Sequence, residues 1–197
     1  MRDQTENIGD CQLHFLQDGG KGKADLLFLH GMKFQAATWS ELGTLAKMAA
    51  EGYRATALDL PGFGLSPAAE ADPLEVVRNF IDSQGLEKTI LVGPSMGGRV
   101  ALEFALANPG LLAGLVLVGA VGVEENRQRL AEIKVPTLII WGGEDAISPV
   151  SNGHLLDKEI ENSQLLIIDS APHPCYLEEP DIFHWELTNF LAENFGI

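Results

Sequence analysis

Five short apolar segments, separated by amphipathic stretches, constrain the fold of this chain most strongly. Within each segment successive residues are apolar, as in the strands of a sheet that helices cover on both faces. The segments are 26–30 (LLFLH), 90–93 (ILVG), 115–119 (LVLVG), 137–141 (TLIIW) and 165–169 (LLIID). Strands that alternate with helices form βαβ units. The sequence therefore predicts the α/β class, with a mostly parallel central sheet flanked by helices.

Helix-start signals precede several of the amphipathic stretches. Asp72 can cap a helix that begins at Pro73, because a short acidic side chain accepts from the free N–H groups of the first turn. Thr38 and Glu41 have the spacing of a capping box ahead of an apolar stripe, so we predict a helix over 39–51. Further helices are expected over 97–108 and from residue 180 onward.

The first forty residues have a different pattern. Two short segments, around 7–8 and 12–16, are joined by Gly9-Asp10. Because glycine and aspartate are frequent in tight turns between antiparallel strands, we predict a hairpin that leads into the parallel strands.

Composition and charge limit the classes of partner. The chain has 197 residues, of which 46% are hydrophobic, and a formal net charge of −15, so we expect one domain over 1–197. This charge repels nucleic acids and anionic membranes, and it fits either a solvated surface or the steering of cationic substrates. The N-terminus lacks the apolar segment of a secretory signal, and Cys11 and Cys175 form no disulfide or metal motif. We therefore expect a cytoplasmic protein without nucleic-acid or membrane partners.

Gly93-Pro94-Ser95-Met96-Gly97 matches the pattern G-x-S-x-G between a predicted strand and a predicted helix. A serine on such a tight turn projects its hydroxyl outward only if its neighbours are small enough for the strand and the helix to approach each other. A nucleophilic role for Ser95 follows from this context.

A nucleophilic serine needs a base within hydrogen-bond reach. His173 lies just after the last predicted strand, in a turn-rich loop, at the sheet edge where open α/β sheets build their sites. The histidine in turn needs a carboxylate that fixes its tautomer. Asp145 follows the strand over 137–141, and the order serine, aspartate, histidine is that of one hydrolase fold. Glu144, Glu124 and Glu125 also follow strands and are competing candidates for the acid.

Acyl transfer also requires donors that stabilise the negative oxygen of the tetrahedral intermediate. In this fold they are the backbone N–H after the nucleophile and one from the loop after an earlier strand. The corresponding donors here are the N–H groups of Met96 and of Met32, which follows His30-Gly31.

Several longer motifs resemble those of the α/β-hydrolase superfamily over nearly the whole chain. They are LLFLHGMKF, ALDLPGFGLS, LVGPSMGG, WGGEDAISP and APHPCYLEEP. Within the superfamily the chain most resembles the small α/β-hydrolase domain-containing 14 group. The resemblance implies a triad of Ser95, Asp145 and His173, with Met32 and Met96 as oxyanion donors. Ala171-Pro172 departs from this pattern, because a glycine is usual before the histidine.

Larger relatives insert a helical cap between the strands at 115–119 and 137–141, whereas only about residues 121–135 are present here. A cap domain cannot be built from so few residues, so we expect an open site. Its walls would include Phe34, Trp39, Phe63 and Tyr176, although core packing explains each of these aromatic residues equally well.

These features predict a serine hydrolase that acts on ester, thioester or amide groups of a small acyl substrate through an acyl-enzyme. The resemblance leaves open the transfer of the acyl group to coenzyme A. The same triad could also hydrolyse a C–C bond, and a protein of this fold could bind a ligand without turnover. No resident cofactor or metal is implied.

Overall fold

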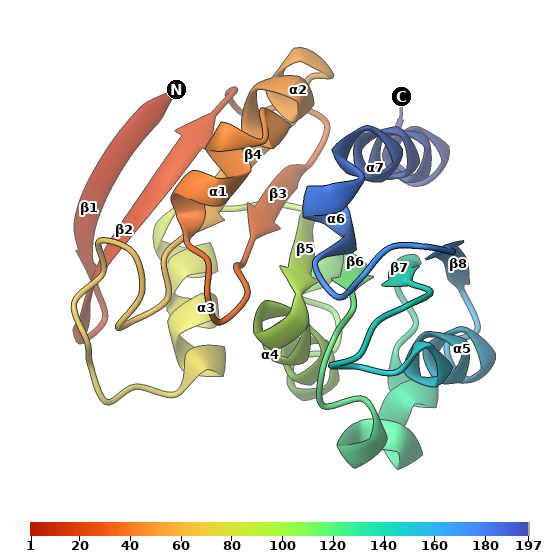
Figure 1. The fold of residues 1–197 in the computed structure, drawn as a ribbon. Coiled ribbons are helices and arrows are strands. Elements are labelled where there is room, and N and C mark those ends of the chain that lie inside the picture. Colours follow the sequence, from red (N-terminus) through yellow and green to blue (C-terminus); the bar gives the residue numbers. More distant parts are fainter. Residues whose placement is uncertain (197) are drawn as a thin grey trace.

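An eight-stranded sheet runs through the computed structural model, which describes residues 1–196 (Figure 1). Its strands are β1 (Arg2–Ile8), β2 (Cys11–Asp18), β3 (Asp25–Phe28), β4 (Arg54–Leu58), β5 (Thr89–Pro94), β6 (Leu112–Val118), β7 (Thr137–Gly142) and β8 (Ser163–Ile168). They lie in the order β1-β2-β4-β3-β5-β6-β7-β8. β2 is antiparallel to β1 and β4, and all other neighbours in this order are parallel. The predicted α/β class is confirmed.

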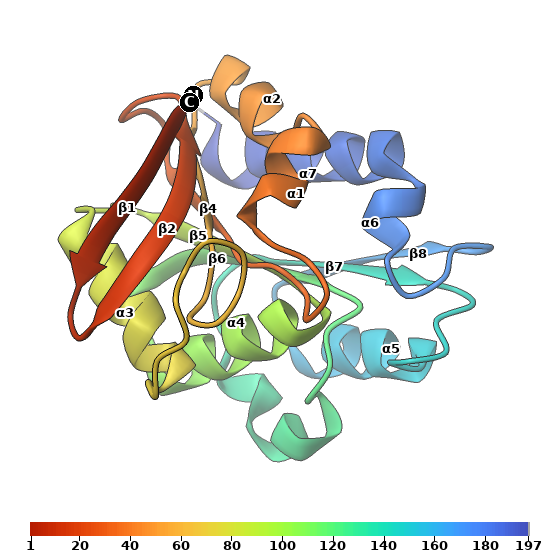
Figure 2. The same ribbon diagram turned by 60° about the vertical axis from the view of Figure 1, so that its left-hand side comes forward.

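Helices cover both faces of the sheet, as the edge-on view shows (Figure 2). One layer contains α1 (Ala36–Glu41), α2 (Thr44–Ala50), α6 (Cys175–Glu178) and α7 (Pro180–Phe195). The opposite layer contains α3 (Pro73–Ser83), α4 (Ser95–Ala107), the 3₁₀ helix η1 (Glu124–Glu132) and α5 (Val150–Glu159). Alternate side chains of one strand enter opposite cores: Leu27 packs in one cluster and Leu26 in the other. The central strands β3, β5, β6 and β7 are largely apolar on successive residues because both of their faces are buried.

The predicted hairpin is confirmed and is longer than expected. β1 and β2 pair from Arg2↔Gln17 to Ile8↔Cys11. Gly9 adopts a φ of 58° in the turn between them, in the left-handed region that glycine enters at little cost. The hairpin extends the antiparallel edge of the sheet.

The prediction of one continuous helix over 39–51 is wrong. The segment forms two helices, α1 and α2, which are separated by Gly43 with a φ of 76°. Gln35 and Thr38 form the capping box of α1, so the helix begins before the predicted Thr38–Glu41 box. The helix from Pro73 is confirmed, and the Asp72 carboxylate accepts a hydrogen bond from the Leu74 N–H at 2.9 Å.

The connection from β6 to β7 contains only η1. No separate cap domain is built within residues 1–196, as the short connection predicts. In the same range, none of the helices combines the length and the apolar character needed to span a membrane. Because the β6–β7 connection is short, the carboxyl ends of the parallel strands are bordered by loops instead of a cap.

Candidate active site

Ser95 lies at the sharp turn between β5 and α4. Its φ of 51° is unusual for a residue with a side chain. A Cβ atom at Gly97 would lie 2.6 Å from the carbonyl oxygen of His30, and one at Gly93 would collide with the carbonyl oxygen of Gly97. The two glycines therefore allow the close approach that this turn requires.

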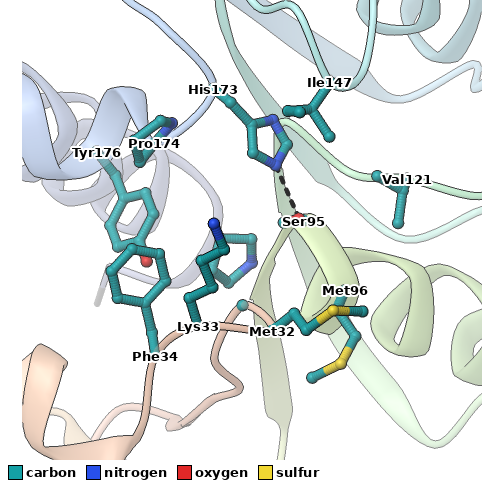
Figure 3. A pocket seen from close by; sticks show the side chains of 12 residues that line it. Met32, Lys33, Phe34, Ser95, Met96, Val121, Ile147, His173, Pro174 and Tyr176 are labelled. Carbon is teal, nitrogen blue, oxygen red and sulfur yellow. Dashed lines mark hydrogen bonds between the residues drawn. The ribbon is translucent and has the colours of Figure 1, made fainter.

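His173, in the loop after β8, links Ser95 at the start of α4 to Asp145 in the loop after β7. Its Nε2 atom is 2.8 Å from Ser95 Oγ (Figure 3), and its Nδ1 atom is 2.7 Å from Asp145 Oδ2. Because a carboxylate only accepts, Nδ1–H donates to Asp145 and Nε2 accepts from the serine hydroxyl. The structure thus brings all three predicted residues together, and Ala171-Pro172 does not prevent the contact.

Backbone groups hold the Asp145 carboxylate, which is almost fully buried. Its second oxygen, Oδ1, accepts hydrogen bonds from the N–H groups of Ile147 and Ser148, both at 2.8 Å. Ser148 Oγ in turn donates to the carbonyl of Ala120 at 2.7 Å. Since Oδ1 is occupied, Oδ2 is fixed toward His173, which restricts the orientation of the imidazole.

Met32 and Met96, whose N–H groups are the predicted oxyanion donors, line the same cavity as Ser95. Met96 lies in the first turn of α4, where an N–H has no carbonyl partner within the helix. The peptide between Gly31 and Met32 is held by its carbonyl oxygen, which accepts from Phe34 N–H at 3.0 Å and from His30 Nδ1 at 2.9 Å. In a planar trans peptide the C=O and N–H point in opposite directions. Fixing this carbonyl therefore also fixes the Met32 N–H.

The tautomer of His30 follows from its two backbone partners. Leu60 N–H donates to His30 Nε2 at 3.1 Å, so the proton must be on Nδ1, which donates to the Gly31 carbonyl. Burial lowers the pKa of His30 and is the largest influence on it. A neutral imidazole with one donor and one acceptor thus joins the loop after β3 to the end of β4.

The Asp59 carboxylate also stabilises the loop after β3. It accepts from the N–H groups of Ala36 at 2.6 Å and Leu65 at 3.0 Å, and it lies 2.7 Å from His14 Nδ1. His14 comes from β2 in the N-terminal hairpin. The antiparallel edge of the sheet is therefore connected to the loop that carries Met32.

The cavity above Ser95 has a volume of about 470 Å³ and is mostly apolar. Phe34 and Tyr176 form one side of it, and Val121 and Ile147 lie on the opposite side (Figure 3). Its mouth is open to solvent, because the side chains of Met32 and Ile147 are both about two-thirds exposed. Such a cavity suits an apolar acyl group beside the serine hydroxyl.

Comparisons with known proteins identify the family of the chain. A family model described as "alpha/beta hydrolase fold" matches residues 26–131, which is more than half of the chain. A protein of Rattus norvegicus named "Putative protein-lysine deacylase ABHD14B" is 38% identical over 185 residues, covering 88% of this chain and 87% of the relative. The chain belongs to the α/β-hydrolase fold family. More narrowly, it is an ABHD14-like α/β hydrolase, an enzyme with hydrolase activity.

Further comparisons extend this similarity. The human protein of the same name is 36% identical to this α/β hydrolase and covers 97% of it, with 95% of the human chain covered. The crystal structure of a protein from Thermoplasma acidophilum described as a "predicted CIB-like hydrolase" has a TM-score of 0.93 at 24% identity, and the match covers 98% of both chains. An esterase from Exiguobacterium antarcticum has a TM-score of 0.85 at 18% identity, covering 97% of this chain and all of the esterase. The two structures support the fold alone.

Two of the four aromatic residues expected at the site of this α/β hydrolase lie elsewhere. The expectation for Trp39 is wrong: its side chain is buried between β3 and α7, packs on Phe28 and Phe183, and donates through Nε1 to the Leu29 carbonyl. Phe63 packs against His30 and borders a neighbouring polar hollow instead of the main cavity. Their spacing in the sequence did not reveal which side of the sheet they would face.

Further residues of the site were not expected. Lys33, Val121 and Ile147 line the cavity, and all three come from loops that follow strands of the parallel sheet, which is the signal that could have found them. Gly119, with a φ of 52°, lies beneath the Asp145–His173 pair. A Cβ atom there would be 3.1 Å from Asp145 Oδ2 and 3.3 Å from His173 Nδ1.

Cys175 lies two residues after His173 but has no access to solvent. Burial, and then the nearby charge of Asp145, raise the pKa of its thiol to about 12. Because the thiolate is the reactive form, this cysteine is a poor nucleophile in the native protein. Ser95, by contrast, lines the cavity and is partly exposed.

Proposed function

We propose that this hydrolase cleaves acyl groups from esters, thioesters or amides, with Ser95 as nucleophile, His173 as general base and Asp145 as the acid that orients it. The single observation that carries this proposal is the continuous hydrogen-bond chain from Ser95 Oγ through both nitrogens of His173 to Asp145. Such a chain allows the serine proton to leave as the oxygen attacks.

The proposed reaction has two halves. Ser95 Oγ attacks the carbonyl carbon while His173 takes the hydroxyl proton, and the N–H groups of Met32 and Met96 stabilise the resulting oxyanion. The intermediate collapses to an acyl-enzyme as His173 gives the proton to the leaving group. Water, activated by His173 in the same way, then releases the acid and restores Ser95.

The names of the rat and human relatives point to acylated lysine side chains as one substrate class. The open mouth of the cavity supports this choice, since a peptide carrying the lysine need not pass through a cap. The same openness lets an acceptor other than water reach the acyl-enzyme, so transfer to coenzyme A is the second candidate.

A fluorophosphonate probe and a chain-length series of 4-nitrophenyl esters test the proposal. We expect covalent labelling of the wild-type protein that Ser95→Ala abolishes, and a loss of kcat of roughly 10⁴-fold or more in Ser95→Ala and in His173→Ala. Acetylated lysine peptides, assayed with and without coenzyme A, separate hydrolysis from transfer. Absence of labelling in the folded wild-type protein would refute the proposed chemistry.

A further inference from the structure

Lys33 places a positive charge in the wall of an otherwise uncharged cavity. With His173 neutral, none of the other residues that line the cavity in the described part of the chain carries a formal charge. The lysine ion pairs within residues 1–196 involve Lys21, Lys134 and Lys158. Lys33 therefore has no carboxylate partner there, although the chain has 28 acidic residues and 13 basic ones.

Lys33 lines the same cavity as Ser95 and His173. In Figure 3 its side chain extends from the loop after β3 into the cavity, between the side formed by Phe34 and Tyr176 and the Ser95–His173 pair. The Lys33 side chain as a whole is exposed, but the cavity wall beside it is mostly apolar. Apolar atoms next to an ammonium group displace part of the water that would screen its charge. An anionic group bound here would interact more strongly than it would with a lysine on an open surface.

A second hollow of about 380 Å³ adjoins the cavity at Lys33. The two share the segment Met32–Lys33–Phe34, and the hollow is also lined by Gln35, Thr38 and the loop around Gly62. Three residues with polar side chains, Lys33, Gln35 and Thr38, thus line a polar hollow next to the apolar cavity. This pairing suits a molecule with an apolar body and a polar end.

We propose that Lys33 recognises a carboxylate on the substrate, so that the enzyme prefers acyl substrates with one negative charge over their neutral counterparts. The inference rests on the proposed function, because it takes Ser95 as the point of attack. The net charge of −15 disfavours anions at long range, but salt screens that field beyond about 8 Å. The local cation therefore determines the preference within the site.

Two matched substrate pairs test on which side of the scissile bond the carboxylate lies. The first pair is the 4-nitrophenyl monoester of adipic acid and its methyl ester, which differ in charge on the acyl side. The second pair is 4-acetoxybenzoate and its methyl ester, which differ on the leaving-group side. The rate measured with Ser95→Ala is subtracted as the spontaneous background. The readout is the ratio of kcat/KM for the charged member to that for the neutral member.

In Lys33→Gln we expect this ratio to fall by about fivefold to tenfold for one of the pairs. Lys33→Glu should lower it further, and Lys33→Arg should keep it within about twofold of wild type. The matched control is Lys88→Gln, because Lys88 is exposed and precedes β5 at the opposite end of the sheet. An unchanged ratio in Lys33→Gln for both pairs would overturn the proposal. Equal losses of kcat for charged and neutral esters would overturn it too, since they would assign Lys33 to stabilising the oxyanion.

Binding without turnover separates this proposal from the proposed function. Calorimetry with uncleaved adipate esters compares Ser95→Ala with the double variant Ser95→Ala/Lys33→Gln. Weaker binding of the charged ester alone to the double variant supports recognition by Lys33, even if no ester is hydrolysed by the wild type. Identical affinities in the two variants would contradict it.

Discussion

Replacing His30 by alanine tests whether the orientation of one peptide controls catalysis. The substitution removes the Nδ1–H donor to the Gly31 carbonyl and leaves the buried Leu60 N–H without an acceptor. An unpaired buried N–H costs about 1–3 kcal/mol, and the vacated ring volume adds to this. We therefore expect His30→Ala to lower the free energy of unfolding by about 2–4 kcal/mol.

The expected effect on catalysis follows from the proposed role of the Met32 N–H as an oxyanion donor. Loss of a complete oxyanion donor costs roughly 10²–10³ in kcat. The loss here should be smaller, about 10- to 100-fold, because Phe34 N–H still holds the Gly31 carbonyl at 3.0 Å. KM should change little, since the donor acts mainly on the transition state. Steady-state hydrolysis of 4-nitrophenyl acetate and urea unfolding measure the two effects.

Two further variants make the test specific. His30→Asn keeps a side-chain donor near the position of Nδ1, so it should recover most of kcat while the protein remains destabilised. His154→Ala is the control, because His154 is exposed on α5, and it should match the wild type in both assays. A folded His30→Ala protein with kcat within twofold of wild type would refute the reasoning.

Three other properties can be tested directly. Burial lowers the pKa of His184, whose Nε2 lies 2.8 Å from Thr44 Oγ1, so below pH of about 6.5 the unfolded state binds more protons than the native state. The stability advantage of wild type over His184→Gln in urea unfolding should therefore shrink between pH 7.5 and 5.5, and a constant difference would contradict the assignment. Cys11 and Cys175 are buried, so intact mass should show no alkylation of the native protein by iodoacetamide and two additions in urea; fast native labelling would be inconsistent with this packing. Trp39→Ala should lower the unfolding free energy by about 3–5 kcal/mol, whereas a loss below about 1 kcal/mol would place the indole outside the core.

The sequence alone predicted the fold class and that Ser95, Asp145 and His173 would come together. The central strands β3, β5, β6 and β7 are buried on both faces and largely apolar, and the edge strand β8 contains an apolar run, so these segments were visible without coordinates. β4 was missed because RATAL contains alanines and threonine instead of large apolar residues. Ser95 was found because a strained turn demands small neighbours, which is a local requirement.

Contacts between distant segments needed the tertiary structure. Nothing near Trp39 in the chain indicated that its ring would pack on α7 while Tyr176, from α6, would line the cavity. The Leu60 N–H reaches the His30 ring only because β3 and β4 are neighbours in the sheet. Local sequence thus determined which residues could react, since propensity and turn geometry act over a few residues. The close packing of the two layers decided which side chains surround them, because it fixes distances between residues far apart in the chain.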